Sequence, residues 1–189
     1  MNNIYLIVGA SGSGKTLITE TLERDYGYKS IQSYTTRPKR NPDETGHTFV
    51  TDAEFDKLTD MVAYTEFCGN RYCATKEQVE ANDLYVIDPK GVEYFKQKYN
   101  GNKGIKIIYI RSDLSARYER MCGRYANSGD DRMSAADKAL TRVANDAKEF
   151  YSYEHGEAHI DFEVDNGLHS DITDVVTKIA DYIKEAEVV

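Results

Sequence analysis

The segment that most constrains this chain is 9–16, which reads G-A-S-G-S-G-K-T and fits the pattern G-x-x-x-x-G-K-[ST]. The apolar, β-branched run at 4–8 precedes it and is typical of a buried strand. After it, Leu17, Ile18 and Leu22 recur at helical spacing. A strand, a glycine-rich turn and a helix therefore follow one another as this pattern requires. The order predicts an α/β phosphate-loop fold, with a parallel sheet flanked by helices.

The glycine-rich turn is predicted to bind the phosphates of a nucleoside triphosphate. Backbone N–H groups of such a loop, together with the positive end of the following helix, form a concave anion site. Lys15 adds a positive charge for the outer phosphates, and the Thr16 hydroxyl is placed to hold Mg²⁺. The alternatives are a turn that binds nothing and a dinucleotide fingerprint, but Leu17 stands where that fingerprint needs a third glycine. The predicted triphosphate contacts are Gly9, Ser11, Gly12, Ser13, Gly14, Lys15 and Thr16.

The composition excludes several classes of partner. The chain has 189 residues, which suits one domain with small insertions. Its net charge of −8 argues against a nucleic-acid polymer as ligand, because no broad basic field exists to displace counterions. No apolar run approaches the roughly 18 residues that span a membrane. Because the first predicted strand begins at residue 4, we expect no signal peptide. The three cysteines show no metal-like pairing, so we expect reduced thiols in a soluble cytoplasmic protein without a membrane partner.

Strand-like runs alternate with helix-like segments, as expected for a parallel sheet with helices on both faces. The predicted strands are 4–8, 29–33, 84–87, 105–110 and 160–164, and the predicted helices are 15–25, 92–99, 114–124, 135–153 and 172–185. The turn-rich stretch 34–83 predicts a small β-rich insertion, and the polar stretch 125–134 predicts a mobile flap between two helices. We therefore expect a single domain, made of a core at 1–33, 84–121 and 137–189, an acceptor-binding insertion at 34–83 and a lid at 122–136.

A basic segment follows the predicted strand at 29–33, and it reads S-Y-T-T-R-P-K-R from Ser33 to Arg40. Arg37 and Arg40 lie three residues apart on an irregular loop. They can converge on one phosphate, because each guanidinium offers a planar fork of donors. The alternative is a solvated basic loop.

With its pieces in this order, the chain resembles the guanylate kinases, a family of nucleoside monophosphate kinases. The matching segments are the phosphate loop, T-T-R-P-K-R at 35–40 with G-H-T-F-V at 46–50, and G-N-R-Y at 69–72. The match continues through I-D-P-K-G at 87–91, R-M-C-G-R at 120–124 and Arg142 to Asp165. The resemblance therefore covers nearly the whole chain, and the two middle motifs are much more specific than the phosphate loop.

The resemblance implies roles for particular side chains. Those implied to bind the acceptor are Ser33, Arg37, Arg40, His47, Tyr72 and Thr75. Those implied to close over the transferring phosphoryl group are Arg120, Arg124 and Arg142, which with Lys15 and Arg37 form the predicted catalytic set. Asp165 is implied to contact the triphosphate. For the first two lid arginines, the alternative is a solvated helix face, since they lie four residues apart on one helix.

Asp88 ends an apolar run, where a carboxylate can reach the metal ion through water and contact the substrate. The alternative role is a cap for the following helix, because Pro89 suits a first helical position.

The chain departs from the family at the positions that read the guanine base. Ala63, Ala74 and Val86 stand where the family usually has polar groups. Glu66 lies three residues beyond Ala63 on a strand-like run, so it would reach the same face only through a bulge or a register shift. We therefore expect weak discrimination among purine bases.

Together these features predict an enzyme that transfers the γ-phosphoryl group of ATP·Mg²⁺ to a nucleoside 5′-monophosphate. The resemblance makes GMP or dGMP the best single candidate for this acceptor. Another nucleotide or a ribosyl bisphosphate is the alternative. A non-catalytic guanylate-kinase-like binding module is the alternative outside catalysis, although such modules typically lose the loop lysine and glycines that are intact here. We expect a monomer or a homodimer.

Overall fold

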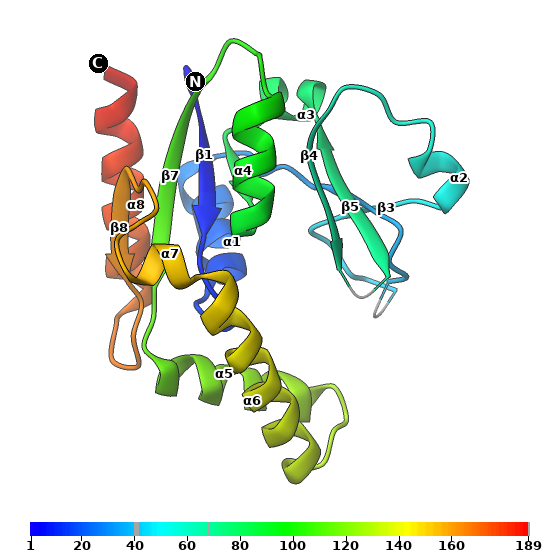
Figure 1. The fold of residues 1–189 in the computed structure, drawn as a ribbon. Helices are drawn as coiled ribbons and strands as arrows, with labels where there is room; N and C mark the ends of the chain where they lie inside the picture. The colour runs from blue at the N-terminus through cyan, green and yellow to red at the C-terminus, as the bar shows by residue number, and fades with distance from the viewer. Residues whose placement is uncertain (40–41, 68, 189) are drawn as a thin grey trace.

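The computed structural model describes residues 1–39, 42–67 and 69–188. Its core is a parallel sheet of four strands in the order β6-β1-β7-β8 (Figure 1). These strands are β1 (Asn3–Val8), β6 (Leu84–Val86), β7 (Gly104–Arg111) and β8 (Phe162–Asp165). The predicted α/β class and the predicted parallel sheet are therefore confirmed.

Helices cover both faces of this sheet. Alternate residues of β1 point to opposite sides, and the apolar residues on each side pack against helices. Tyr5 and Ile7 pack in one buried cluster with residues of α1 and α8. Ile4 and Leu6 pack in the other cluster with residues of α4. A strand that is buried on both faces is apolar throughout, which is the pattern seen at 4–8. The bounds of these helices are α1 (Lys15–Tyr26), α4 (Pro89–Lys98) and α8 (Ile172–Val188).

The predicted strand at 29–33 is wrong. Within the described ranges, this segment pairs with the sheet through an isolated bridge between Ser30 and Leu84 and belongs to no strand. The chain then leaves the core, because the Ser33 carbonyl accepts a hydrogen bond at 3.0 Å from the Thr48 N–H of a second sheet. The segment is thus the connection between the two sheets.

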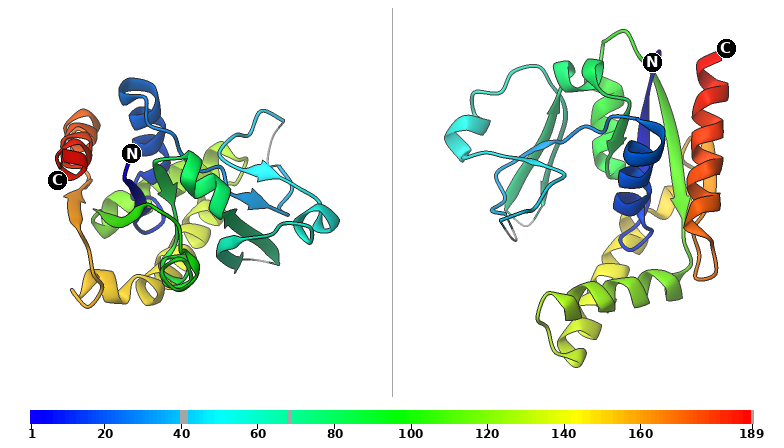
Figure 2. Two further views of the ribbon diagram at one scale, coloured as in Figure 1. Left: turned by 90° about the horizontal axis from the view of Figure 1, so that it is seen from above. Right: turned by 180° about the vertical axis from the view of Figure 1, so that it is seen from behind.

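The second sheet has the order β3-β2-β5-β4 and lies beside the core next to α4 (Figures 1 and 2). Its strands are β2 (Tyr34–Thr35), β3 (Thr48–Phe49), β4 (Met61–Phe67) and β5 (Asn70–Thr75), and the short helices α2 (Asp52–Phe55) and α3 (Lys76–Ala81) accompany them. β4 and β5 form an antiparallel pair with a register shift between Met61 and Ala63.

α5 (Leu114–Asn127) and α6 (Arg132–Glu149) form a helical hairpin that projects from the core (Figures 1 and 2). The polar stretch 125–134 is therefore mostly helical, and only residues 128–131 connect the two helices. The Asp131 carboxylate accepts hydrogen bonds from the N–H groups of Met133 and Ser134 at 2.9 and 3.1 Å, so α6 begins earlier than predicted.

The predicted helix at 135–153 is divided at Phe150, after which α7 (Tyr151–Glu154) begins. Throughout the described ranges, no helix combines the length and the apolar character needed to cross a membrane.

Candidate active site

The phosphate loop joins β1 to α1 through backbone conformations that favour glycine. Gly12 and Gly14 have φ values of +79° and +93°, in the left-handed region. A Cβ atom at Gly12 would lie 2.7 Å from the Arg117 carbonyl oxygen, so a side chain there would also clash. Gly14 precedes the first residue of α1 and brings no capping side chain. The loop can therefore present backbone N–H groups at a helix N-terminus, the geometry of an anion site.

Lys15 is the first residue of α1, and its Nζ donates hydrogen bonds to the carbonyl oxygens of Gly9 and Ala10. Burial lowers the pKa of Lys15 to about 8. The carboxylate of Asp146 acts against this shift, whereas the guanidinium groups of Arg124 and Arg142 add to it. An anion bound at the loop would favour the charged form of Lys15.

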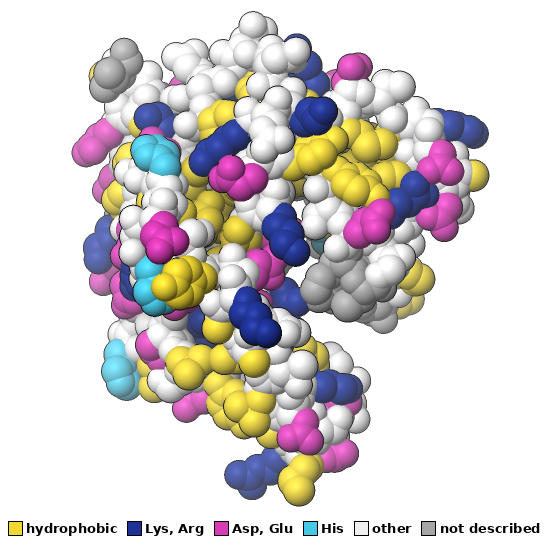
Figure 3. All heavy atoms as spheres, viewed as in Figure 1, with side chains coloured by type: hydrophobic (Ala, Val, Ile, Leu, Met, Phe, Trp, Pro, Cys, Tyr) yellow, Lys and Arg dark blue, Asp and Glu magenta, His cyan; other side chains and the backbone are white. Residues whose placement is uncertain are grey.

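A cavity of about 650 Å³ extends from the phosphate loop to the second sheet and to α6. Figure 3 shows the molecule hollowed between the core and the second sheet, with basic and acidic side chains inside the hollow. The predicted site residues that line this cavity are Gly9, Ser11, Lys15, Ser33, His47, Tyr72, Asp88 and Arg142. The structure thus brings the loop and most of the predicted acceptor residues to one space.

Ser33, His47 and Tyr72 lie together at the end of the cavity formed by the second sheet. Ser33 Oγ and His47 Nδ1 are 3.0 Å apart and share a hydrogen bond. The ring centroids of His47 and Tyr72 are 5.7 Å apart. A hydroxyl, an imidazole and a phenol that converge in this way can donate hydrogen bonds to a phosphate.

Arg37 is not among the described residues that line the cavity, and its predicted contact with the acceptor phosphate stays a prediction. Its Nη2 and Nη1 donate to the two carboxylate oxygens of Glu44 at 2.7 and 3.2 Å, and its guanidinium carbon lies 5.3 Å from the centroid of the Phe49 ring. The guanidinium also interacts with Tyr72, which lines the acceptor end of the cavity, so the bidentate ion pair holds it beside that end. Arg40, its predicted partner, lies outside the described residues.

Thr75 is also placed differently from the prediction. It forms a capping box with Gln78 at the start of α3: its Oγ1 accepts from the Gln78 N–H at 3.4 Å, and its own N–H donates to Gln78 Oε1 at 3.2 Å. Among the described residues that line the cavity, Thr75 is absent. Its hydroxyl serves the helix terminus.

Asp88 has the capping role that the sequence leaves open, and it also lies at the cavity. It lines the cavity, and its Oδ1 accepts a hydrogen bond from the Gly91 N–H at 2.6 Å, which caps α4. Glu149 of α6 lines the same cavity. Burial, and then the negative charge of Asp88, raise the pKa of Glu149. The carboxylates of Asp88 and Glu149 therefore add negative charge to a cavity that Lys90 and Lys148 also line.

The three predicted lid arginines occupy different environments. Arg142 lines the cavity, and its Nε donates to Ser11 Oγ at 2.6 Å. Arg124 is exposed on α5, and its charge acts on Lys15.

Arg120 lies outside the cavity lining, and all its described hydrogen bonds join segments of the core. It donates to the carbonyl oxygens of Gly12, Asn166 and Gly167 and to Ser112 Oγ, at 2.9 to 3.3 Å. Its guanidinium is thus attached to the phosphate loop and to the turn after β8.

Asp165 lies in a second hollow of about 440 Å³, together with Asp113 and Leu168. Its Oδ2 accepts hydrogen bonds from the Gly167 N–H at 3.3 Å and from Ser170 Oγ at 3.4 Å. The adjacent residue Asn166 connects this hollow to the phosphate loop, because its Nδ2 donates to the Ser13 carbonyl at 2.8 Å. The contact between Asp165 and a triphosphate stays a prediction.

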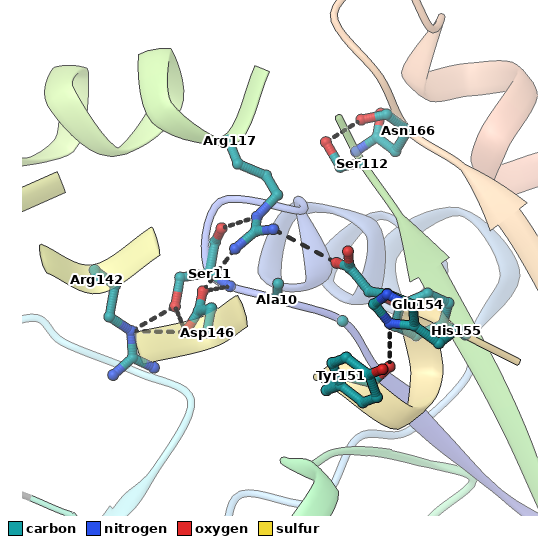
Figure 4. A network of polar contacts seen from close by, with 12 residues as sticks. Ala10, Ser11, Ser112, Arg117, Arg142, Asp146, Tyr151, Glu154, His155 and Asn166 are labelled. Carbon is teal, nitrogen blue, oxygen red and sulfur yellow. Dashed lines mark hydrogen bonds and ion pairs between the residues drawn. The ribbon is translucent and has the colours of Figure 1, made fainter. Parts of the chain in front are cut away.

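A buried ion pair beside the loop was missed by the sequence reasoning. Asp146 of α6 has no exposed surface, and it pairs with Arg117 of α5 at 3.0 Å (Figure 4). The sequence places the Ser11 N–H among the phosphate contacts. In the structure it donates a hydrogen bond to the Asp146 carboxylate at 2.7 Å, so it does not point to a phosphate. Nothing in the local pattern marks either charged residue as buried, because the partners are far apart in the chain.

Comparisons with known proteins point to one family. A family model described as guanylate kinase matches residues 1–186. A guanylate kinase of Neisseria gonorrhoeae is 28% identical over 177 residues, which cover 87% of this chain and 83% of that protein. A guanylate kinase of Neisseria meningitidis serogroup A is 29% identical over 159 residues, 78% of this chain and 75% of that protein. The crystal structure of guanylate kinase from Anaplasma phagocytophilum is similar in fold, with a TM-score of 0.55 at 17% identity over 97% of this chain and 86% of that chain.

Proposed function

This chain belongs to the guanylate kinase family of nucleoside monophosphate kinases, and we propose that it transfers the γ-phosphoryl group of ATP to a nucleoside 5′-monophosphate, with GMP or dGMP as the preferred acceptor. The observation that supports this most is the single cavity between Lys15 of the phosphate loop and Ser33, His47 and Tyr72 of the second sheet. Two ends that each suit a phosphate, within one space, favour direct transfer between two bound nucleotides. We place the reaction in the cytoplasm, where the thiols of the chain would stay reduced.

Positioning and charge neutralisation supply most of the catalysis in phosphoryl transfer. Lys15 and Arg142 line the loop end of the cavity, where their positive charges would stabilise the charge that develops on the transferring group. At the other end, Ser33, His47 and Tyr72 would orient the acceptor phosphate for attack. Closure of the α5–α6 hairpin would exclude water, which otherwise competes as acceptor.

Thr16 and Asp88 are the residues that would hold Mg²⁺. Their donor atoms are hydroxyl and carboxylate oxygens, the kind of ligand that Mg²⁺ prefers. No group of three or more metal-ligating side chains occurs in the part of the chain that the structure describes. This suits an ion that takes its remaining ligands from phosphate oxygens and water. When bound, the ion supplies positive charge to the phosphates.

The two alanines that stand at base-reading positions support only weak recognition of guanine. Ala63 and Ala74 are cross-strand partners, 2% and 0% exposed, and neither can hydrogen-bond a base through its side chain. The register shift of β4 lies before Ala63, and pairing is regular from there to Glu66. Glu66 alternates with Ala63 along the strand, yet it lines the same cavity, where its carboxylate accepts a hydrogen bond from Tyr64.

An assay of ADP release with ATP and a panel of nucleoside monophosphates tests the proposed reaction. Turnover should depend on the acceptor and be fastest with GMP or dGMP. Lys15→Ala should lower kcat about 10²-fold or more while its circular dichroism spectrum stays that of the wild type. Release of ADP that is independent of every monophosphate would contradict the proposal.

The same assay tests the base. An apolar slot separates similar rings by only about 10- to 200-fold, whereas a site that hydrogen-bonds its substrate reaches about 10⁴-fold. We expect GMP to exceed AMP and IMP by the smaller factor, and Ala63→Glu to raise kcat/KM for GMP alone. High selectivity in the wild type that Glu66→Gln removes would show instead that Glu66 reads the base.

A further inference from the structure

The Asp146 carboxylate is completely buried, although it lies in the hairpin helix α6. Its Oδ2 accepts hydrogen bonds from the Ser11 N–H at 2.7 Å and from Arg117 Nη2 at 3.0 Å. Its Oδ1 accepts from Ser11 Oγ at 3.3 Å and lies 3.3 Å from Arg142 Nε. Asp146 thus joins the phosphate loop, α5 and α6 at one point (Figure 4).

The two arginines beside Asp146 differ in exposure. A buried carboxylate is costly unless charge and hydrogen bonds compensate for its lost hydration. Arg117, whose side chain is 6% exposed, forms the closer ion pair and supplies that compensation. Arg142 is 29% exposed and lines the cavity with Lys15. Arg117 is therefore suited to a structural role, whereas Arg142 faces the site of the reaction.

Arg142 contacts Asp146 and Ser11 through Nε, the inner nitrogen of its guanidinium. In Figure 4 its two outer nitrogens point away from Asp146. A planar guanidinium that is held at Nε has little freedom to rotate, so the direction of its outer nitrogens is set. Those nitrogens are the fork that binds a phosphate with two parallel hydrogen bonds.

We propose that Asp146 is a positioning residue for phosphoryl transfer: it holds Arg142 by Nε and the phosphate loop by the Ser11 N–H, so that the outer nitrogens of Arg142 meet the transferring phosphoryl group in one orientation. The inference rests on the proposed function. Asp146 would then fix the core end of the α5–α6 hairpin to the phosphate loop. The loop and Arg142 would keep their relative positions when the rest of the hairpin moves.

A double-mutant cycle separates this role from a purely structural one. The variants are Asp146→Asn, Arg142→Ala and the two combined, and Asp137→Asn is the control, since Asp137 is an exposed carboxylate on the same helix. We expect Asp146→Asn to lower kcat by about 10²-fold with much smaller changes in both KM values, and Asp137→Asn to match the wild type. In the Arg142→Ala background, Asp146→Asn should cost little further, because the arginine is absent and the amide oxygen of asparagine can still accept from the Ser11 N–H. Equal losses in both backgrounds, or a wild-type kcat for Asp146→Asn, would overturn the proposal.

Arg142→Lys gives a second test, which is needed if Asp146→Asn does not fold. Lysine keeps the charge, but a single ammonium cannot contact Asp146 and still present a separate fork to a phosphate. We expect its kcat to fall nearly as far as that of Arg142→Ala, and a kcat near wild type would overturn the proposal. A wild type that phosphorylates no nucleoside monophosphate would overturn the proposed function and this inference together, whereas an active wild type with unaffected variants would overturn only this inference.

Discussion

Arg120 allows the structure and the family resemblance to be tested against each other. The resemblance implies that Arg120 neutralises charge during transfer, which predicts a loss of kcat in a stable protein. In the structure, its guanidinium donates four hydrogen bonds to the phosphate loop, to Ser112 and to the turn at Asn166 and Gly167. These contacts predict instead that Arg120→Ala destabilises the fold around the loop.

The size of that effect follows from the contacts. A hydrogen bond from a charged group contributes about 1.5–3 kcal/mol. Arg120 is only partly buried, so water can replace some of its four bonds after truncation. We therefore expect Arg120→Ala to lower the free energy of unfolding by about 2–4 kcal/mol, which in a chain of this length lowers Tm by roughly 5–15 °C.

Thermal unfolding followed by circular dichroism measures this, with urea unfolding as a second probe. Arg124→Ala is the matched control, because Arg124 lies one turn further along α5 and is exposed. It should change stability by less than about 0.5 kcal/mol while lowering kcat. If Arg120→Ala keeps the wild-type Tm and loses kcat as Arg124→Ala does, the hydrogen bonds to the core contribute little and Arg120 acts as the resemblance implies.

Further predictions concern charge and binding. Because burial lowers the pKa of Lys15 to about 8, kcat/KM for ATP should be level below that pH and fall as pH rises through it and Lys15 loses its proton; a profile that stays level well above pH 8 would contradict this. Glu44→Gln should lower the KM for the acceptor and Arg37→Ala should raise it, with the KM for ATP nearly unchanged in both, because in the proposed site Glu44 would compete with the acceptor phosphate for Arg37. If Arg37 only stabilises its loop, steady-state kinetics would show that Glu44→Gln raises the KM for the acceptor instead of lowering it. Thr75→Ala should lower the free energy of unfolding by about 1 kcal/mol, the usual value of a helix cap, and leave the KM for the acceptor unchanged. A raised KM for the acceptor would show that Thr75 contacts the acceptor, as the resemblance implies.

The parts of the fold that the sequence predicted correctly depend on local patterns. The phosphate loop was recognisable because its glycines, the apolar strand before it and the helix after it are contiguous. The apolar stripe of α8 likewise depends on residues three and four apart. By contrast, 29–33 has the composition of a strand, but its structure depends on a distant residue. The Thr48 N–H donates a hydrogen bond to the Ser33 carbonyl, and this contact joins the end of the segment to the second sheet.

The predicted site was least reliable where a side chain has a competing partner. Arg37 is the right kind of residue for a phosphate, yet Glu44 already binds its guanidinium in a bidentate ion pair. Asp146 could not be found from the sequence, because its contacts to Ser11 join residues 135 positions apart. Such pairings arise from tertiary packing. The residue spacing within a single helix or strand does not predict them.

The central claim is that one cavity holds both the triphosphate and its acceptor. A bisubstrate analogue, with two nucleosides joined by a chain of phosphates, tests it most directly by isothermal titration. We predict that it binds the wild type more tightly than ATP or GMP alone, and that Lys15→Ala at one end and Tyr72→Phe at the other each weaken its binding. If Lys15→Ala weakens the analogue while Tyr72→Phe and Ser33→Ala both leave its Kd unchanged, the second sheet does not bind the acceptor and the account is contradicted.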